Sequence, residues 1–206
     1  MDKFQNKYRI ASARARFWDY GWNAAYFVTI CTRNRICWFG DVSDGVMELS
    51  AMGHIANSCW HEIPNHFPFV ELGGHIIMPN HVHGIVIINK PDDGGDQPDR
   101  IVETQNIVET QHVASLQSSS SPSSSSSPPP SHKPKNQFGP QSKNLASIIR
   151  GFKIGVTKNA RQISPDFAWQ SRYHDHIIRN DRSYQNISEY IINNPLKWSE
   201  DDFFDV

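Results

Sequence analysis

The spacing of apolar side chains predicts strands and helices in alternation along the chain. Runs rich in β-branched and aromatic residues favour strands. They occur at residues 25–32, 69–78, 82–88 and 173–179, and a shorter strand is expected at 46–49. The turn dipeptide Pro79-Asn80 separates two of these runs, so we expect a strand–turn–strand hairpin around it.

Apolar residues at spacings of three and four predict helices at residues 50–63, 142–163 and 183–194. Ser183 is a suitable N-cap for the last helix, and Pro195 would stop it. The strongest stripe is in the second helix and comprises Leu145, Ile148, Ile149, Phe152 and Val156. The element order β, β, α, β, β, α, β, α predicts an α+β fold, an antiparallel sheet with helices packed on it.

Residues 89–138 have the composition of a disordered segment. They contain KPDDGGDQPDR, a repeated hexad (IVETQN, IVETQH) and a run of serines and prolines. Such a stretch cannot bury enough apolar surface to offset its ordering entropy. We therefore expect one domain over residues 1–206, with a core of about 8–88 and 139–198. A disordered low-complexity insertion at 89–138 would interrupt that core, and its two ends would lie close together.

The composition indicates in which compartment the protein is found and excludes some classes of protein. No apolar run reaches the ~18 residues that a membrane-spanning helix needs, and the N-terminus lacks the apolar stretch of a signal peptide. We therefore expect a cytoplasmic protein with no membrane partner. The cysteines Cys31, Cys37 and Cys59 are odd in number and without C-x-x-C spacing, which argues against a disulfide framework or a zinc ribbon.

Charge is distributed unevenly, although the net charge is −1 at pH 7. Residues 1–35 hold seven Lys or Arg against two acids, and residues 139–182 hold eight against three. Residues 36–88 hold five acids and no Lys or Arg. The two basic segments would form a polyanion-binding face if the fold brings them together. Ordinary solvated charged surfaces are the alternative interpretation.

His81-Val82-His83 is the first candidate for chemistry. Because side chains alternate across a strand, both imidazoles would face one side, about 7 Å apart along the chain. Imidazole binds Mn, Zn, Fe and Ni ions, so the pair could hold one ion. Two hydrogen-bonded structural histidines are the alternative. A second pair, His174-Asp175-His176, alternates in the same way but has a charged middle residue.

The surroundings of the first pair resemble a known family. Sequence stretches of that family occur here in its order, AYFVTICTRNR, HIIMPNHVHGIVI and WQSRYHDHIIRN…YIINNPLKW. In them the chain is similar to the single-tyrosine HUH (His-hydrophobic-His) transposases, and most to the REP-associated tyrosine transposases. The resemblance covers about residues 8–88 and 139–198. It implies a ferredoxin-like or RNA-recognition-motif-like sheet, with the histidine pair on a central strand.

The resemblance also implies a set of catalytic residues. The family's nucleophile is a tyrosine on the last helix, which matches Tyr190, and Asn194 matches an oxygen-donating third metal ligand beside His81 and His83. Residues i and i+4 share a helix face, so Tyr190 and Asn194 would approach the histidines together. The residue before a proline avoids helical dihedral angles, which leaves the direction of Asn194 open. The alternative nucleophiles are Tyr8, Tyr20, Tyr26, Tyr173 and Tyr184.

The activity implied by the resemblance is nicking and rejoining of single-stranded hairpin DNA through a 5′-phosphotyrosine, with Mg²⁺ or Mn²⁺ as cofactor. A non-catalytic DNA-binding module and a DNA hydrolase that uses a metal-bound water are the alternatives. Some relatives are homodimers that exchange the tyrosine helix, so a homodimer is left open. The candidate DNA contacts are Arg150, Lys153, Lys158, Arg161, Arg172 and Arg179, with Trp169 as a base-stacking platform or a core residue.

Overall fold

The fold is built on a four-stranded antiparallel sheet in the order β6-β7-β3-β8. A computed structural model describes residues 3–4, 7–8, 18–91, 142–201 and 204. The sheet consists of β3 (Ala24–Cys31), β6 (Val70–Ile77), β7 (His81–Ile88) and β8 (His174–Ile178). The other elements are β1 (Lys3–Phe4), β2 (Lys7–Tyr8), η1 (Arg33–Arg35), β4 (Gly40–Ser43), β5 (Val46–Leu49), α1 (Ala51–His61), α2 (Ile63–His66), α3 (Leu145–Ala160), α4 (Asp181–Asn193) and η2 (Pro195–Glu200).

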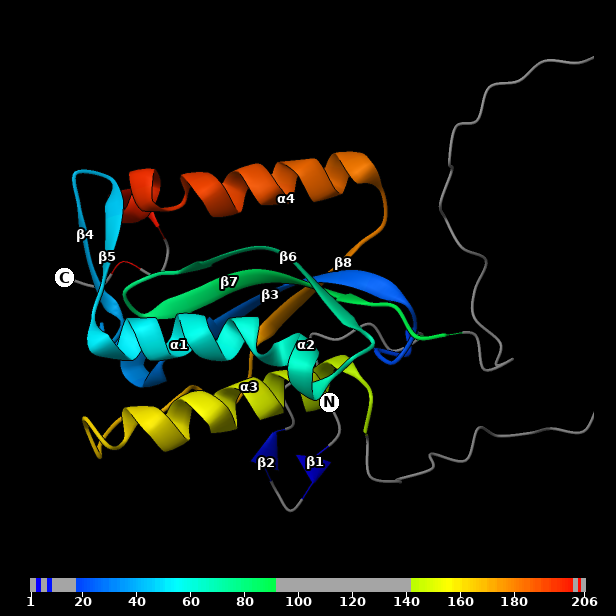
Figure 1. Cartoon of the computed structure of the whole chain (residues 1–206), viewed down its shortest axis with the longest axis horizontal. Helices are drawn as coiled ribbons and strands as arrows, with labels where there is room; N and C mark the ends of the chain where they lie inside the picture. Colours follow the sequence, from blue (N-terminus) through cyan, green and yellow to red (C-terminus); the bar gives the residue numbers. More distant parts are fainter. Residues whose placement is uncertain (1–2, 5–6, 9–17, 92–141, 202–203, 205–206) are drawn as a thin grey trace, which may run out of the picture. The chain divides into compact units, whose positions relative to one another are not determined.

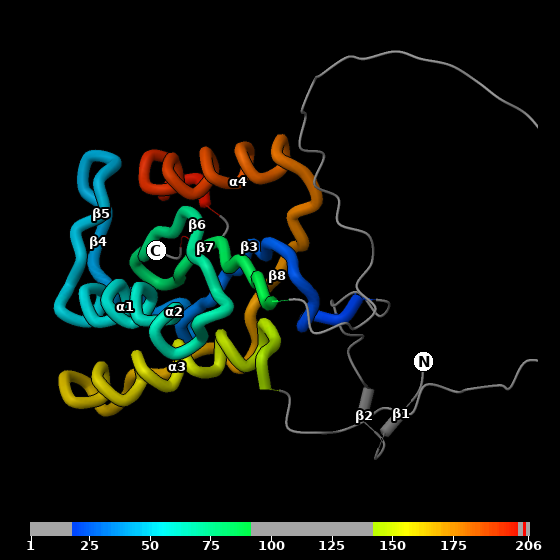
Figure 2. Tube along the Cα trace, turned by 45° about the vertical axis from the view of Figure 1, so that its right-hand side comes forward, coloured from blue at the N-terminus to red at the C-terminus, as the bar shows by residue number. Residues whose placement is uncertain are grey.

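Helices cover both faces of this sheet. Figures 1 and 2 show α1 and α3 along one face and α4 along the other. In chain order the sheet and its two crossover helices read β3-α1-β6-β7-α3-β8, with β7 and β3 in the centre. This is the ferredoxin-like arrangement, so the predicted α+β fold is confirmed. None of the described helices is both long and apolar enough to cross a membrane.

Strand β7 sends alternate side chains into two different layers. Val82 and Val86 enter the large apolar core beneath α1 and α3. Ile85 enters a smaller apolar cluster with Ile191 of α4. Because His81 and His83 have the same parity as Ile85, they belong to the α4 layer. That layer therefore combines a modest apolar core with buried polar groups.

Helix α3 follows the sequence prediction closely. Every residue of the predicted stripe is buried, and Asn144 and Ser147 form a reciprocal capping box at the N-terminus. The predicted helix over 50–63 instead ends at His61 and is followed by the short helix α2, which has Pro64 in its first turn. Pro at the start of a helix removes only an amide that lacks a helical partner, so α2 begins anew there.

Helix α4 begins earlier than predicted. Its N-cap is Asn180, whose side chain accepts a hydrogen bond from the amide of Ser183. The prediction of Ser183 as N-cap is therefore wrong, because Ser183 already lies in the first turn and its amide is the group that is capped. The carboxylate of Asp181 stands in the same turn, where the helix dipole favours negative charge.

Strand β4 was not predicted, although β5 coincides with the strand expected at 46–49. The two strands form a hairpin around Asp44 and Gly45, which have φ angles of 51° and 74°. Two consecutive residues with positive φ make the turn that matches the twist of a two-stranded hairpin. Asp-Gly is a preferred sequence for that turn, so the signal was present in the chain.

The predicted insertion at 89–138 lies, from residue 92 onward, outside the described residues, as do residues 9–17 of the predicted core. The division of the chain therefore stays a prediction. The described flanks approach one segment: Lys90 exchanges two hydrogen bonds with the Asn23 side chain, and the amide of Leu145 donates to the carbonyl of Tyr20. The two described flanks of residues 92–141 therefore both lie beside residues 20–23.

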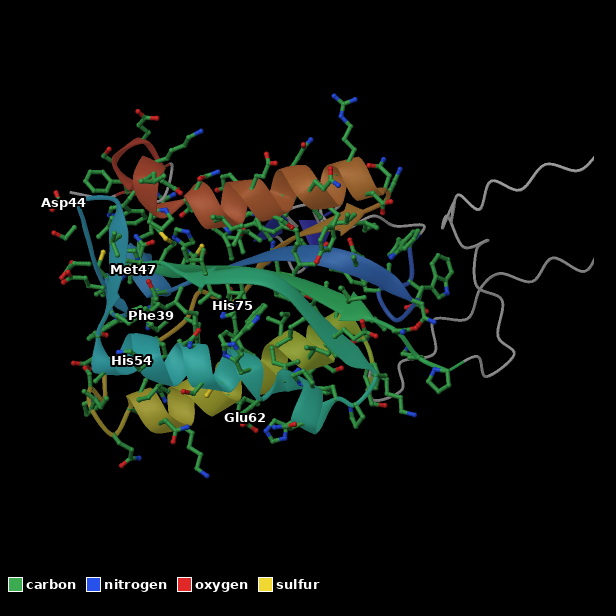
Figure 3. The ribbon with its side chains drawn as sticks, turned by 45° about the horizontal axis from the view of Figure 1, so that its top comes forward. Phe39, Asp44, Met47, His54, Glu62 and His75 are labelled. Atoms are coloured by element: carbon green, nitrogen blue, oxygen red, sulfur yellow. The ribbon has the colours of Figure 1, made fainter. Side chains whose placement is uncertain are left out.

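His75 links β6 to α1 in the α1 layer (Figure 3). Its Nε2–H donates to Oδ1 of Asn57 at 2.9 Å, and its ring stacks on Trp60 at a centroid distance of 5.7 Å. Burial, followed by the charge of His61, lowers the pKa of His75 to about 4. The folded state therefore holds this imidazole neutral at pH values where the unfolded chain would protonate it.

We expect the folded protein to lose stability as the pH falls from 6.5 to 4. In that window the unfolded state binds more protons at His75 than the folded state does, so protonation favours unfolding. The part of this loss that is due to His75 should reach at most about 3 kcal/mol, from a pKa difference of roughly 2.5 units. Urea unfolding at pH 7 and pH 4.5 measures it. His75→Gln should show a smaller loss over the same window, and equal losses in both proteins would contradict the assignment.

Candidate active site

His81 and His83 lie side by side in the centre of the sheet, at the beginning of β7. Their side chains are 0% and 1% exposed, and their ring centroids are 4.4 Å apart. Gly84 follows the pair, and a Cβ atom there would lie 2.2 Å from a ring carbon of Trp60. Trp60 therefore packs directly on the backbone behind the histidines. This close packing holds the strand segment that carries both imidazoles.

Hydrogen bonds from neighbouring side chains orient both rings. Nδ1 of His81 lies 2.9 Å from Oδ1 of Asn80, whose amide nitrogen donates to the carbonyl of Arg35. Because the Asn80 oxygen can only accept, Nδ1 of His81 carries the proton and Nε2 holds a lone pair. Nδ1 of His83 lies 2.9 Å from Oγ1 of Thr29. Metal-binding histidines are commonly oriented by such bonds to their second nitrogen.

Both histidines are neutral at physiological pH. Burial, followed by the positive charge of Arg35, lowers the pKa of His81 to about 3. Burial and the neighbouring His81 lower the pKa of His83 to about 3, against an opposing effect of Asp201. A neutral imidazole is the form that binds a metal ion. The pair is therefore already in the state that a metal ligand requires.

Tyr190 reaches this pair from α4. Its hydroxyl oxygen lies 3.2 Å from Nε2 of His83, and its ring contacts Phe27 edge-on at 6.1 Å. Ile191, the next residue, is buried against Ile85 of β7 and fixes this part of the helix on the sheet. Tyr190 itself is 44% exposed. The phenol and the imidazoles thus meet within one chain, at a position open to an incoming molecule.

The amide of Asn194 is buried beside the same site. Its backbone keeps helical angles (φ −59°, ψ −40°) although Pro195 follows, so its side chain remains on the face of Tyr190. Its Nδ2 donates to a carboxylate oxygen of Asp201 at 3.1 Å. Its Oδ1 is buried and has no hydrogen-bond partner among the described residues. A buried acceptor of this kind is costly unless something binds it.

Asp201 brings a carboxylate that the sequence analysis missed. One ligand atom each from His81, His83 and Asp201 lies within 4.8 Å of the others. Two neutral imidazoles, a carboxylate and the amide oxygen of Asn194 suit a divalent cation that accepts both nitrogen and oxygen ligands. The residues present therefore fit a metal ion, without fixing its identity.

The other tyrosines with described side chains do not approach the histidines as Tyr190 does. Tyr26 is fully buried, and burial raises its pKa to about 12. Tyr20 stacks on Tyr26 at 5.8 Å, and the hydroxyl of Tyr184 lies against Gly73. Tyr173 packs against the core beneath α1 and α3 and lines a groove beside α3. The side chains of the first 17 residues, including Tyr8, are outside the described set. Among the described tyrosines, Tyr190 is therefore the best placed to act with the pair.

The second histidine pair lies at the edge of the sheet. His174 and His176 on β8 pair with Thr29 and Phe27 of β3, so they face the α4 layer, whereas Asp175 faces the other. Both histidines are exposed. Within the described part of the chain, they are not in the group of ligands around His81.

The predicted basic DNA contacts on α3 lie across the sheet from Tyr190. Arg150, Lys153, Lys158 and Arg161 line a groove of about 630 Å³ between α3 and residues 171–173. Arg172 and Arg179 are exposed at the two ends of β8. The structure thus brings His81, His83, Tyr190 and Asn194 together but keeps the α3 cations apart from them.

Lys153 and Trp169 make contacts that favour packing roles. The Lys153 ammonium donates to the carbonyls of Gln170 and Arg172, and burial lowers its pKa to about 8. Trp169 packs with Phe39, Phe152 and Phe167 at centroid distances of 5.3–5.8 Å, and its Nε1 donates to the carbonyl of Lys153. This packing fits the core role that was one of the two interpretations of Trp169, and contact of either side chain with DNA stays a prediction.

Comparisons with known proteins agree with this fold. No protein-family model matches the chain. An uncharacterised protein of Haemophilus influenzae is 35% identical over 195 residues, covering 94% of this chain and 92% of that protein. A REP-associated tyrosine transposase solved in complex with a REP hairpin superposes with a TM-score of 0.52 and 17% identity. The match covers 91% of this chain and 74% of the transposase. The chain therefore has the fold of that transposase, as the sequence resemblance implied.

Proposed function

We propose that this chain, which belongs to the same protein family as the uncharacterised Haemophilus influenzae protein, is a tyrosine transposase that nicks and rejoins single-stranded hairpin DNA. The observation that carries the proposal is the contact between the Tyr190 hydroxyl and Nε2 of His83, 3.2 Å apart, beside a cluster of potential metal ligands. The shared fold with a transposase bound to a DNA hairpin gives independent support.

Tyr190 is the proposed nucleophile. Its oxygen attacks the scissile phosphorus and forms a 5′-phosphotyrosine, while the bond from phosphorus to the 3′ oxygen breaks and leaves a free 3′-OH. The covalent link keeps the energy of the phosphodiester, so the 3′-OH of another strand can displace Tyr190 and rejoin the DNA. The exposure of Tyr190 allows a strand to reach it, and the packing of α4 through Ile191 holds it in place.

His81, His83 and Asn194 are the proposed metal ligands. A bound Mn²⁺ or Mg²⁺ would supply Lewis-acid polarisation of the scissile phosphate. Mn²⁺ fits the imidazoles better, because Mg²⁺ prefers oxygen ligands. Without such help any tyrosine is a weak nucleophile at neutral pH, because the reference pKa of a phenol in peptides is about 10.

DNA would enter on the α4 side of the sheet. A cleft of about 490 Å³ beside Tyr190 is lined mainly by residues of α4 and η2, and its charged residues are Lys197, Glu189, Glu200 and Asp201. Arg172 and Arg179 flank the exposed edge strand β8 and could bind phosphates on the way to it. Arg150, Lys158 and Arg161 on α3 would then contact another part of the hairpin. Because Tyr190 and the potential metal ligands meet within one chain, the proposed activity would not require exchange of α4 between subunits.

The proposal is tested by incubating the full-length protein with labelled hairpin single-stranded DNA and Mn²⁺. The expected product is a protein–DNA adduct that survives SDS, together with a cleaved strand. Nicking without an adduct would indicate a hydrolase that uses water. Binding without cleavage would indicate a non-catalytic DNA-binding module. Either of these two results would overturn the proposed mechanism.

A further inference from the structure

Asp201 is held at the metal cluster by the segment that follows α4. Trp198 of η2 is 9% exposed and packs on the ring of His81 at a centroid distance of 5.9 Å. The amide of Asp201 then donates to the carbonyl of Trp198 at 3.2 Å. Contacts with the site itself thus place this carboxylate, which is partly buried.

We propose that Asp201 is a ligand of the metal ion, which gives the site two imidazoles and a carboxylate. The inference deepens the proposed function, since it adds a residue to the same site. It rests on the ligand atoms of His81, His83 and Asp201, which all lie within 4.8 Å of one another. Two ligands bound to one ion at about 2.0–2.2 Å are at most about 4.4 Å apart, so side-chain movements of a few tenths of an ångström would bring all three atoms to bonding distance.

The carboxylate changes the chemistry of the site. Imidazole binds a metal ion in its neutral form, so with His81 and His83 alone the ion would keep its full double charge in a buried position. A buried charge needs an opposite charge to offset its desolvation. Asp201 supplies one, and leaves a net positive charge that still attracts a phosphate. A hard oxygen ligand also favours Mn²⁺ or Mg²⁺ over softer metals.

Asn194 provides a second observation that points to the same ion. It is 2% exposed, its Nδ2 is engaged by Asp201, and its Oδ1 has no hydrogen-bond partner in the described part of the chain. Asp201 thus fixes which way the amide is turned. With Nδ2 bound to the carboxylate, Oδ1 is the atom of Asn194 that remains for a cation. Asp201 would be a ligand and would also position Asn194.

The test measures metal binding in the absence of DNA. Mn²⁺ affinity is determined by calorimetry for the full-length protein, for Asp201→Asn and for the matched control Glu200→Gln. Asp201→Asn keeps the size and an oxygen acceptor for Asn194 but removes the charge. We expect it to weaken Mn²⁺ binding at least ~10-fold, since even partners outside the ligand set of a metal site are worth 10–100-fold. Glu200, exposed and adjacent, should make no difference.

Visible absorption of bound Co²⁺ distinguishes a ligand from a nearby charge. The d–d bands at saturating Co²⁺ should change in Asp201→Asn, because a ligand has been altered. Unchanged bands with weaker affinity would show that Asp201 acts only through its charge, and would overturn the inference. The inference would also be overturned if Asp201→Asn bound Mn²⁺ as tightly as the unaltered protein, or if Glu200→Gln weakened binding equally. Absence of Mn²⁺ binding by the unaltered protein would overturn it as well. A protein that binds Mn²⁺ through Asp201 but forms no DNA adduct would leave this inference standing and remove the proposed function.

Discussion

Replacing Tyr190 by Phe should abolish the covalent protein–DNA adduct. Phe keeps the edge-on contact with Phe27 and the packing beside Ile191, but it lacks the oxygen that lies 3.2 Å from His83. Loss of a nucleophile costs roughly 10⁴-fold or more in rate. The adduct should therefore fall below detection in a denaturing gel with labelled hairpin DNA. Mn²⁺ affinity and thermal stability should change little, because the ring remains.

Tyr184→Phe is the matched control for this experiment. Tyr184 lies on the same helix, two turns before Tyr190, and its hydroxyl contacts Gly73 rather than the histidines. Adduct formation should persist in this variant. An adduct that survives in Tyr190→Phe and disappears in Tyr184→Phe would assign the nucleophile to the other tyrosine. Cleavage without an adduct in Tyr190→Phe would show that water can replace the phenol.

The sequence predicted those parts of the fold that depend on the spacing of residues within a single strand or helix. The alternation of HVHGIVII placed His81 and His83 on the same side of a strand, and the structure has them there. The stripe from Leu145 to Val156 predicted the buried face of α3. Spacing of four on α4 predicted that Tyr190 and Asn194 share a face, and Asn194 keeps this direction because its backbone stays helical before Pro195. The convergence of the phenol and the imidazoles is observed, whereas their catalytic roles stay a prediction.

Asp201 could not be predicted from the sequence, because its position depends on a tertiary contact. Nothing in the local pattern distinguishes it from Glu200 and Asp202. Its approach to the histidines depends on Trp198, which packs on His81 from a different part of the chain. Strand β4 is a different case, since the Asp-Gly turn signal was present and was not used.

Counting Lys and Arg along the chain does not show on which face of the sheet these residues lie. Residues 139–182 are rich in Lys and Arg, and all the candidate DNA contacts predicted from the sequence lie within them. The periodicity of α3 fixes which residues face outward, but it does not say which face of the sheet the helix covers. The structure places α3 and α4 on opposite faces, so Arg150 and Arg161 lie across the sheet from Tyr190, the proposed nucleophile. Their contribution to DNA affinity, if the proposal holds, should leave cleavage chemistry unchanged.

Replacing His81 and His83 together by Ala should remove both metal binding and cleavage. The double substitution takes away two ligands of the candidate site and the partner of the Tyr190 hydroxyl. Lewis-acid stabilisation by a metal is worth several kcal/mol, so adduct formation should fall at least ~100-fold. Added Mn²⁺ should raise the melting temperature of the unaltered protein, since a ligand that binds only the folded state stabilises it. The same addition should leave the double variant's melting temperature unchanged.

The double variant His174→Ala with His176→Ala is the control. It shows whether the loss of another histidine pair on the sheet has the same effect as the loss of His81 and His83. These residues alternate on β8 and face the same layer, but they are exposed and lie outside the ligand cluster. The control variant should keep both the Mn²⁺-dependent rise in melting temperature and the adduct. Each variant is compared with and without Mn²⁺, so a loss of stability from the cavities left by buried imidazoles cancels in the difference. A rise in melting temperature that persists without His81 and His83, and vanishes without His174 and His176, would move the metal site to the edge strand.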